Sequence, residues 1–554
     1  MHSRSLRFRF AMIAAFTTAA CTSADRNAKP AGEIGGTLII AMPAEPGTLL
    51  PPLMQAAQEK VIADQVFDML AEIGPDLNTY GDVGFTPRLA DSWQWSADSL
   101  SVAFRLNPRA RWHDGPSVSS SDVRFSLDLY KDPKVAARTA GVFSDVDSIS
   151  TPDSLTAVVW YARRSPEQFY NVVYNLVIMP EHLLRDADRA NLAAHPNARH
   201  PVGSGPFRFV RWDGRSALEV AADTAYHMGR PLLNRVIWQL GLDPATIMVP
   251  VLAGEIDMFE NVTSESMARI AAQEMVKAVR FHGPNYGYLG FNLRDPKNPA
   301  RPHPLFADRQ LRRALSMAID RPLLLKNVYD SLAFPGMGPF SRLLSAADTT
   351  LAQLPFDSAG ADRLLDSLGW RDGNGDGVRE KAGRPLRFAI TVPSSSPPRR
   401  RYAELIQAQL RPHGVQVDVD VGDPASAFPR FFTSQFDAMV NNWATDPTPS
   451  TMRESWYSAS VAERRSNLQL YGNPAVDASI DSAMREPDAA RSRAHYRRAY
   501  QQIIDDAPSI WLYENRNFMA LNSRVKPVFK GSDVWWRQLR LWSIPAAGRL
   551  PRDG

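Results

Sequence analysis

A strand–helix–strand succession in the second half of the chain limits the folds that the sequence can adopt. PLRFAITVP, residues 385–393, and VQVDVDV, residues 415–421, are rich in β-branched residues and read as strands. Between them RYAELIQAQLRPHG, residues 401–414, has the pattern of a helix. Two strands joined through a helix usually pair in parallel, so this run predicts an α/β fold with parallel strands.

The length of the chain excludes a single hydrophobic core. With 554 residues, the sequence is expected to form about three or four domains. Further patterns predict a strand over 37–42, helical spacing over 59–74 ending at Gly74-Pro75, an alternating strand over 99–106 and an amphipathic helix over 310–320. No period of 20 to 50 residues repeats, which excludes a solenoid.

The N-terminus has the features of an export signal. Residues 1–10 hold three arginines and no acid, and residues 11–20 form a short apolar run that ends in small residues. The next residue, Cys21, is the single cysteine of the chain, so no intramolecular disulfide is possible. TAAC, residues 18–21, resembles a bacterial lipobox, with Thr18 where leucine is usual; residues 1–20 are therefore predicted to be a lipoprotein signal peptide, Cys21 the lipidated residue and 21–33 a tether.

The charge gives no sign of a nucleic-acid partner. The formal net charge is +4, but without residues 1–20 it falls to about +1. After the signal, no apolar run is long enough for a membrane helix.

The stretch RWHDGPSVSSSDVRFSL, residues 111–127, places a histidine beside an aspartate and ahead of four serines. Adjacent side chains in extended backbone point to opposite sides, so His113 and Asp114 are not expected to form a catalytic pair. Ser119 and Asp122 instead fit a capping box at the start of a helix. The stretch is predicted to be a turn between a strand and a helix.

Motifs for catalysis or metal binding are absent from the sequence. There is no P-loop, HExxH, G-x-S-x-G or Rossmann glycine pattern, and the ten histidines are scattered. No cofactor or metal is therefore predicted. DGNGDGVREKAG, residues 372–383, matches the first half of an EF-hand loop, but Gly383 stands where the bidentate glutamate is needed, so a turn-rich hairpin is favoured over a cation site.

Several segments together resemble the extracytoplasmic solute-binding proteins of ABC importers, family five, the oligopeptide, dipeptide and nickel type. They occur in the family's order over about residues 35–525: GGTLIIAMPAEPGTLLPP, FTPRLADSWQWSADSLSVAFRLNPRARWHDGPSVSSSDVRFSL, VGSGPFRFVRW, AGEIDM, GFNLRDPKNPARPHPLFADRQLRRALSMAIDR, DSLGWRDGNGDGVREKAGRPLRF and NWATDPTPS. The resemblance implies a bilobal periplasmic-binding-protein-like α/β fold of type II, in its large three-domain form, with a hinge between the lobes. It also implies the domain boundaries: domain I over 34–54, 195–288 and 506–546, domain II over 55–194, and domain III over 289–505.

The resemblance also points to ligand-binding residues in NNWATDP, residues 441–447. Asp446, three residues after Trp443, matches the aspartate that receives the ligand's α-ammonium in peptide-binding relatives. Trp443 would form an apolar wall, and the backbone groups of Asn442 and Ala444 would pair with a peptide main chain. Thr448 replaces a second aspartate found in many relatives. Tyr288 and Asn292 are expected either to face the cleft or to pack at the hinge; Arg453 is expected to be a solvated helix charge, and Trp456 and Tyr457 to be core.

These features predict a monomeric binding protein, not an enzyme, that captures short peptides in an interlobe cleft. It would be anchored outside the cytoplasm by lipid at Cys21 and would deliver its ligand to the permease and ATPase subunits of an ABC importer. The same scaffold could take a nickel chelate, a sugar or an opine. A secreted hydrolase is disfavoured because no nucleophile motif is present.

Overall fold

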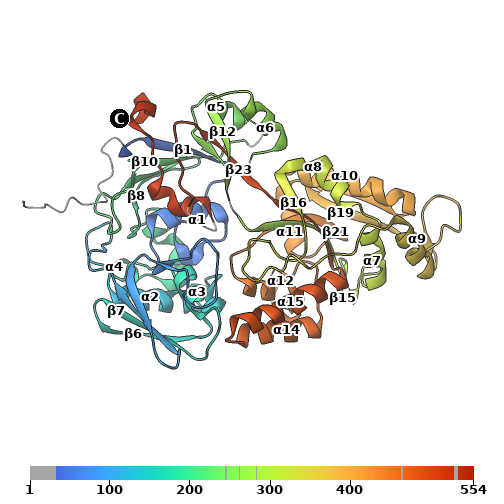
Figure 1. Cartoon of the computed structure of the whole chain (residues 1–554), viewed down its shortest axis with the longest axis horizontal. Coiled ribbons are helices and arrows are strands. Elements are labelled where there is room, and N and C mark those ends of the chain that lie inside the picture. The colour runs from blue at the N-terminus through green and yellow to red at the C-terminus, as the bar shows by residue number, and fades with distance from the viewer. Residues whose placement is uncertain are drawn as a thin grey trace, which may run out of the picture.

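The computed structural model describes residues 33–553 except 244–245, 261, 282, 463–465 and 530–533. The predicted signal peptide, Cys21 and nearly all of the predicted tether lie outside the described residues. The described chain forms two lobes, which Figure 1 shows side by side. This arrangement confirms the predicted bilobal α/β fold.

The first lobe is built on two sheets. A seven-stranded mixed sheet has the order β12-β23-β11-β1-β10-β9-β8, and a four-stranded antiparallel sheet has the order β4-β5-β7-β6. The larger sheet comprises β1 (Thr37–Met42), β8 (Phe207–Asp213), β9 (Ala217–Ala222), β10 (Arg235–Leu240), β11 (Met258–Phe259), β12 (Val276–Phe281) and β23 (Asn517–Asn522). The smaller comprises β4 (Ala90–Trp95), β5 (Ser101–Leu106), β6 (Val146–Asp153) and β7 (Thr156–Tyr161).

The second lobe is built on a six-stranded sheet of order β16-β22-β13-β21-β19-β20. Its strands are β13 (Asn285–Phe291), β16 (Ala333–Pro335), β19 (Arg387–Pro393), β20 (Gln416–Gly422), β21 (Ala438–Ala444) and β22 (Ser509–Asn515). β19 and β20 pair in parallel and flank α10 (Pro397–Leu410) in the sequence, which confirms the predicted strand–helix–strand unit. Alternate residues of β13 enter different cores: Leu289 packs in one cluster and Tyr288 in another.

Helices cover these sheets. In the first lobe they are α1 (Ala57–Val66), α2 (Ser120–Lys131), α3 (Gln168–Asn175), α4 (Glu181–Leu184), α5 (Met248–Leu252) and α6 (Ser264–Ala271). In the second they are α7 (Arg309–Met317), α8 (Arg321–Val328), α9 (Ser358–Ser367), α10, α11 (Pro424–Phe432), α12 (Met452–Trp456), α13 (Ala459–Ala462), α14 (Pro474–Arg485) and α15 (Ala489–Asp506). Within the described residues, none of the helices combines the length and the apolar character that a membrane span requires.

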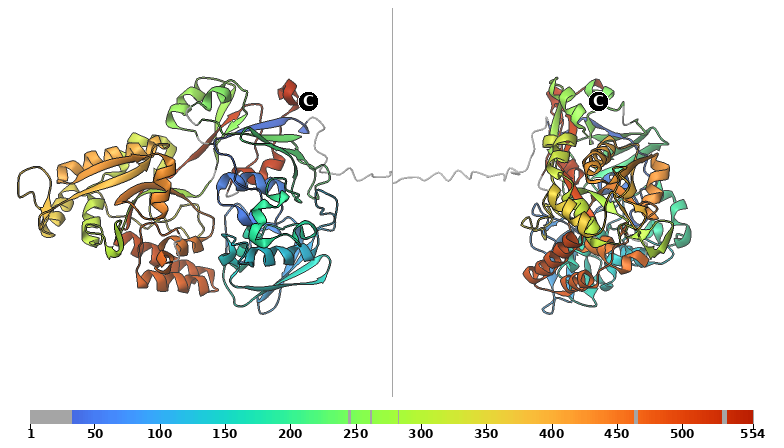
Figure 2. Two further views of the ribbon diagram at one scale, coloured as in Figure 1. Left: turned by 180° about the vertical axis from the view of Figure 1, so that it is seen from behind. Right: turned by 90° about the vertical axis from the view of Figure 1, so that its right-hand side faces the viewer.

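The lobes are joined where strands of one sheet continue into the other. β12 leads into β13, and β22 leads into β23 (Figures 1 and 2). At the second junction Asn515 is the last residue of β22 and Asn517 the first of β23. The backbone N–H of Asn515 donates to Asn285 Oδ1 over 3.1 Å, so the two junctions lie side by side. Two short adjacent links are the arrangement expected of a hinge.

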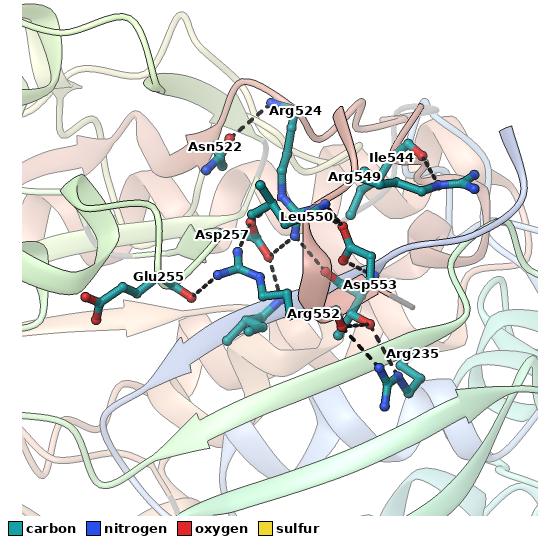
Figure 3. Close-up of polar contacts among 12 residues, drawn as sticks. Arg235, Glu255, Asp257, Asn522, Arg524, Ile544, Arg549, Leu550, Arg552 and Asp553 are labelled. Carbon is teal, nitrogen blue, oxygen red and sulfur yellow. Dashed lines mark hydrogen bonds and ion pairs between the residues drawn. The ribbon is translucent and has the colours of Figure 1, made fainter. Parts of the chain in front are cut away.

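The C-terminal residues are fastened to the first lobe by a buried polar cluster (Figure 3). Asp257 is fully buried and accepts from the Arg524 guanidinium over 2.8 and 2.9 Å and from Arg552 over 2.9 Å. Asp553 accepts from the backbone N–H of Thr37 over 2.8 Å and also pairs with Arg524. The same cluster of charged side chains therefore holds the start of β1 and the C-terminal residues together.

The stretch over 111–127 is a structural turn, as predicted. Ser119 and Asp122 form the capping box that begins α2. His113 Nε2 lies 2.9 Å from the carbonyl oxygen of Gly205, whereas Asp114 pairs with His182 over 2.8 Å. His113 and Asp114 thus have different partners and form no catalytic pair.

The prediction that helical structure continues to Gly74 is wrong. α1 ends at Val66, and Ala71–Glu72 instead form β2, which pairs with β3 (Thr86–Pro87). The Val66 carbonyl oxygen accepts from the N–H of Gly205 over 2.8 Å, a contact from a distant segment that replaces the next helical bond.

Candidate ligand-binding site

One edge of β21 extends beyond its neighbour. β19 pairs only Ile390 and Thr391 with Ala438 and Met439, so the segment from 440 to 444 continues past the end of that pairing. Among the described residues, β21 has no other strand partner on this side. The sheet therefore presents an open strand edge near the start of the NNWATDP segment.

The backbone groups of Asn442 and Ala444 face this open edge. The N–H of Thr445 donates to the carbonyl oxygen of Pro284 over 2.9 Å, toward the β13 side. Backbone N–H groups alternate in direction along a strand, so those of Ala444 and Asn442 point the other way. These are the two residues whose backbone the sequence predicted to pair with a peptide.

A small pocket, partly open to solvent, adjoins the same end of β21. Its wall is mainly aromatic and apolar; it comprises Tyr286, Pro339, Leu344, Trp443, Thr445, Thr451, Met452, Ser455, Trp456 and Tyr500. Within the described protein, Asn442 Nδ2 and Thr445 Oγ1 are inaccessible and have no hydrogen-bond partner. Unsatisfied polar atoms beside an aromatic pocket are typical of a binding site.

Next to this pocket the two lobes touch through Glu167. Glu167, just before α3 in the first lobe, is 3% exposed. Its carboxylate accepts from the Thr79 hydroxyl over 2.6 Å and from the Thr448 hydroxyl of the second lobe over 2.8 Å. Burial raises the pKa of Glu167, and its hydroxyl donors only partly offset the desolvation.

A second contact lies beside the first. The Ser492 hydroxyl of α15 is 3.4 Å from the hydroxyl of Tyr80 in the first lobe. The Arg493 guanidinium lies 4.8 Å from the centroid of the same tyrosine ring. The structure therefore holds the lobes together near residues 446–448.

The remaining residues named from the sequence occupy different positions. Asp446 is exposed and is two residues from the buried Thr448. Asn292 is fully buried and donates to the carbonyl oxygens of Ser434 and Phe436 over 2.7 and 3.0 Å, contacts that favour a packing role. Burial also raises the pKa of Tyr288, to about 12, and its hydroxyl lies 3.5 Å from Asn441 Nδ2.

Arg453, Trp456 and Tyr457 differ in their exposure. Arg453 lies on α12 with its side chain 38% exposed, as expected of a helix charge near solvent, and it pairs with Asp481 over 2.5 Å and lies 3.8 Å from the ring centroid of Tyr457. Trp456 is buried and forms part of the pocket wall.

The cation site over 372–383 finds no support in the geometry. Asp372 accepts from the backbone N–H groups of Gly375 and Gly377 over 2.7 and 2.9 Å, as in an ordinary turn. In the part of the chain that the structure describes, no three His, Cys, Asp or Glu side chains are grouped to hold a metal ion.

Sequence reasoning missed Glu167 and the pocket residues Tyr286, Met452 and Tyr500. Glu167 and Thr448 are 281 residues apart, and nothing in SPEQFYN distinguishes a contact residue from a helix-start carboxylate. No local pattern could have found this contact.

Residues 84–463 match the model of the bacterial extracellular solute-binding proteins, family 5, middle region. This chain belongs to that family. As a family 5 solute-binding protein it is a binding protein of ABC transport and not an enzyme, and it acts outside the cytoplasm.

Relatives match nearly the whole chain. The oligopeptide-binding protein AppA of Bacillus subtilis is 25% identical over 530 residues, which cover 93% of this chain and 94% of AppA. The structure of AppA with a nonapeptide superposes with a TM-score of 0.79 at 23% identity, covering 92% of this chain and 99% of AppA. NikZ of Campylobacter jejuni, in complex with Ni(L-His), gives the same TM-score and identity over 92% of this chain and 99% of its own. These structures share the fold of the family 5 protein described above.

Proposed function

We propose that this family 5 protein captures short peptides in extended form between its lobes and delivers them to the permease of an ABC importer. The observation that carries the proposal is the open edge of β21, where the backbone groups of Asn442 and Ala444 point away from β13. A peptide added to such an edge is held through its main chain, so many side chains are tolerated. The aromatic pocket beside Trp443 would accept an apolar side chain.

Asp446 is proposed to receive the α-ammonium of the peptide. It follows the open edge by two residues and its side chain is exposed. A carboxylate–ammonium pair that becomes enclosed on closure is both strong and directional.

Closure of the lobes would complete the site. The Glu167–Thr448 and Tyr80–Ser492 contacts join the lobes close to Asp446. A ligand that bridges both lobes stabilises this closed arrangement by its differential affinity.

The proposal includes the anchor and the domain division. The sequence supports three of these features: lipidation at Cys21 after removal of residues 1–20, a tether over residues 21–33, and a monomeric state. The three-domain division is supported by sheet membership, with two adjustments. β13 and β22 both pair within the six-stranded sheet, so we place the first crossing between β12 and β13 rather than at 288–289, and the second at 515–517 rather than at 506.

Mass spectrometry of the solute released by denaturing the purified mature protein tests the peptide class directly. A short peptide recovered intact is the expected result. Recovery of a nickel chelate, a sugar or an opine would show that the ligand is not a peptide. Recovery of a cleaved peptide would favour the hydrolase alternative.

Asp446→Ala tests the ammonium contact. Binding of a peptide with a free amino terminus, followed by the fluorescence of the 13 tryptophans, should weaken about tenfold or more, since a charge-assisted bond is lost. Binding of the N-acetylated peptide should not change between the two proteins. Glu404→Ala, which removes a carboxylate paired with Arg400 on the surface of α10, is the matched control. Equal affinity of Asp446→Ala and the parent for the free-amine peptide would refute the assignment.

A further inference from the structure

A second pocket lies where the chain crosses between the lobes. It is small and partly open to solvent, and its wall includes Phe281 and Asn285 at the first junction and Arg516 at the second. The wall also includes Arg280 of β12, Phe334 of β16, residues 341–343 and Glu514. The pocket is therefore built from both lobes, and the proposed function uses none of its side chains.

Three arginines converge on one ring in this pocket. The guanidinium carbons of Arg516, Arg342 and Arg280 lie 4.0, 4.3 and 5.7 Å from the ring centroid of Phe334. Each cation is attracted to the ring face, but that attraction is weak and does not cancel the mutual repulsion of three like charges.

The charges of this pocket are not balanced by protein carboxylates. Glu514 is the one acid on the wall, and it is already bound to the Arg342 side chain over 3.2 Å and to its backbone N–H over 2.8 Å. Among the described residues no carboxylate lies within ion-pair distance of Arg280 or Arg516. The Arg516 Nε is buried and lacks a hydrogen-bond partner. Three arginines against one glutamate leave a formal excess of two positive charges.

We propose that Arg280, Arg342 and Arg516 form a binding site for a small oxyanion at the hinge, separate from the open edge of β21. Guanidinium groups present planar sets of donors that match carboxylate and phosphate oxygens, and a dianion balances the excess charge. Arg280 belongs to β12 of the first lobe and Arg342 follows β16 of the second, so the bound anion connects the lobes. Its binding should therefore favour one setting of the hinge.

The test uses inorganic phosphate as the probe and the full mature protein freed of solute. Isothermal titration should show saturable binding of one phosphate, and the melting temperature should rise with phosphate concentration. Arg280→Ala should bind phosphate at least about tenfold more weakly. Arg516→Lys keeps the charge but loses the planar donor set, and it should also bind more weakly.

Arg105→Ala is the matched control. Arg105 is a half-exposed arginine of β5 paired with Asp153, and its loss removes the same charge far from the hinge. Phosphate affinity of this variant should equal that of the parent. The absence of saturable binding, or equal affinities of Arg280→Ala and Arg105→Ala, would overturn the proposal.

Two sources can supply the oxyanion: the C-terminal carboxylate of a captured peptide, or a free ion. Competition of phosphate with a peptide and with its C-terminal amide distinguishes them. Displacement of phosphate by the free-carboxylate peptide alone would identify the captured solute as a source, whereas displacement by neither would identify a free ion. Both outcomes retain the oxyanion site. The phosphate titration requires no peptide, so failure of the peptide proposal leaves its result intact.

Discussion

At the scale of single residues, the carboxylate of Glu167 has the most unusual environment of the interlobe contact. It is almost fully buried, and its side-chain donors among the described residues are the hydroxyls of Thr79, Thr448 and Ser450. A charge buried in this way is costly, and the cost falls when the group takes up a proton.

Closure should therefore depend on pH through Glu167. Burial in the closed state raises the pKa of this carboxyl, so the closed state binds the proton more tightly than an open state in which Glu167 is solvated. Protonation of Glu167 stabilises the closed state fully at a pH below the pKa that this carboxyl has in the open state. The stabilisation is lost as the pH rises through the higher pKa of the closed state. Peptide affinity should increase as the pH falls through this interval.

The variant Glu167→Gln removes the titrating group and keeps an oxygen for the threonine hydroxyls. Affinity measured by tryptophan fluorescence across this pH range should become flat relative to the parent. The comparison uses the N-acetylated peptide, which has no ammonium group to pair with Asp446. An unchanged pH profile in Glu167→Gln would show that another group is responsible.

At the scale of secondary-structure elements, the free end of β21 is the feature with a direct functional consequence. Ala444 directs its N–H away from β13, so this group takes no part in the pairing of the two strands. Proline at an unpaired strand edge is tolerated, because no ladder hydrogen bond is lost.

Ala444→Pro should therefore weaken peptide binding without unfolding the sheet. The loss of one main-chain hydrogen bond, about 0.5–1.5 kcal/mol, corresponds to roughly a three- to tenfold lower affinity. Trp443→Pro is the contrasting variant, because Trp443 pairs with Tyr286 on the β13 side and its change should lower the melting temperature. A parental affinity in Ala444→Pro would show that the ligand does not pair with this edge.

Local patterns predicted much of the fold but little of the interlobe contact. The capping box at Ser119 and the parallel unit of β19, α10 and β20 depend on neighbouring residues, and the sequence was sufficient for both. The end of α1 depends on a contact from Gly205, and the Glu167–Thr448 contact joins residues 281 positions apart. Periodicity carries no information on such pairs, so only the folded chain reveals them.

At the scale of the whole molecule, the cluster around Asp257 and Asp553 should dominate the stability of the first lobe. Asp257→Ala leaves the Arg524 guanidinium, 6% exposed, without its principal partner. Breaking a buried ion pair in this way costs about 3–5 kcal/mol. Calorimetry should show a lower unfolding temperature for the first lobe and no change for the second.

The control for that experiment is Asp418→Ala, which removes a half-exposed ion pair with Arg387 on the second lobe. Exposed pairs contribute about 0–1 kcal/mol, so its thermogram should match that of the parent. Equal destabilisation of both lobes by Asp257→Ala would mean that the two unfold as one cooperative unit.

The pairing of the two junctions has a topological consequence. Because Asn285 and Asn515 meet through a hydrogen bond, the polypeptide leaves the first lobe and returns to it at the same place. The second lobe is thus one continuous insert in the first lobe, and its two ends lie side by side. The seven-stranded sheet of the first lobe is completed only when the chain returns and forms β23. Such an insert can be excised or transplanted as one piece, since removing it leaves a gap that a single short loop would close.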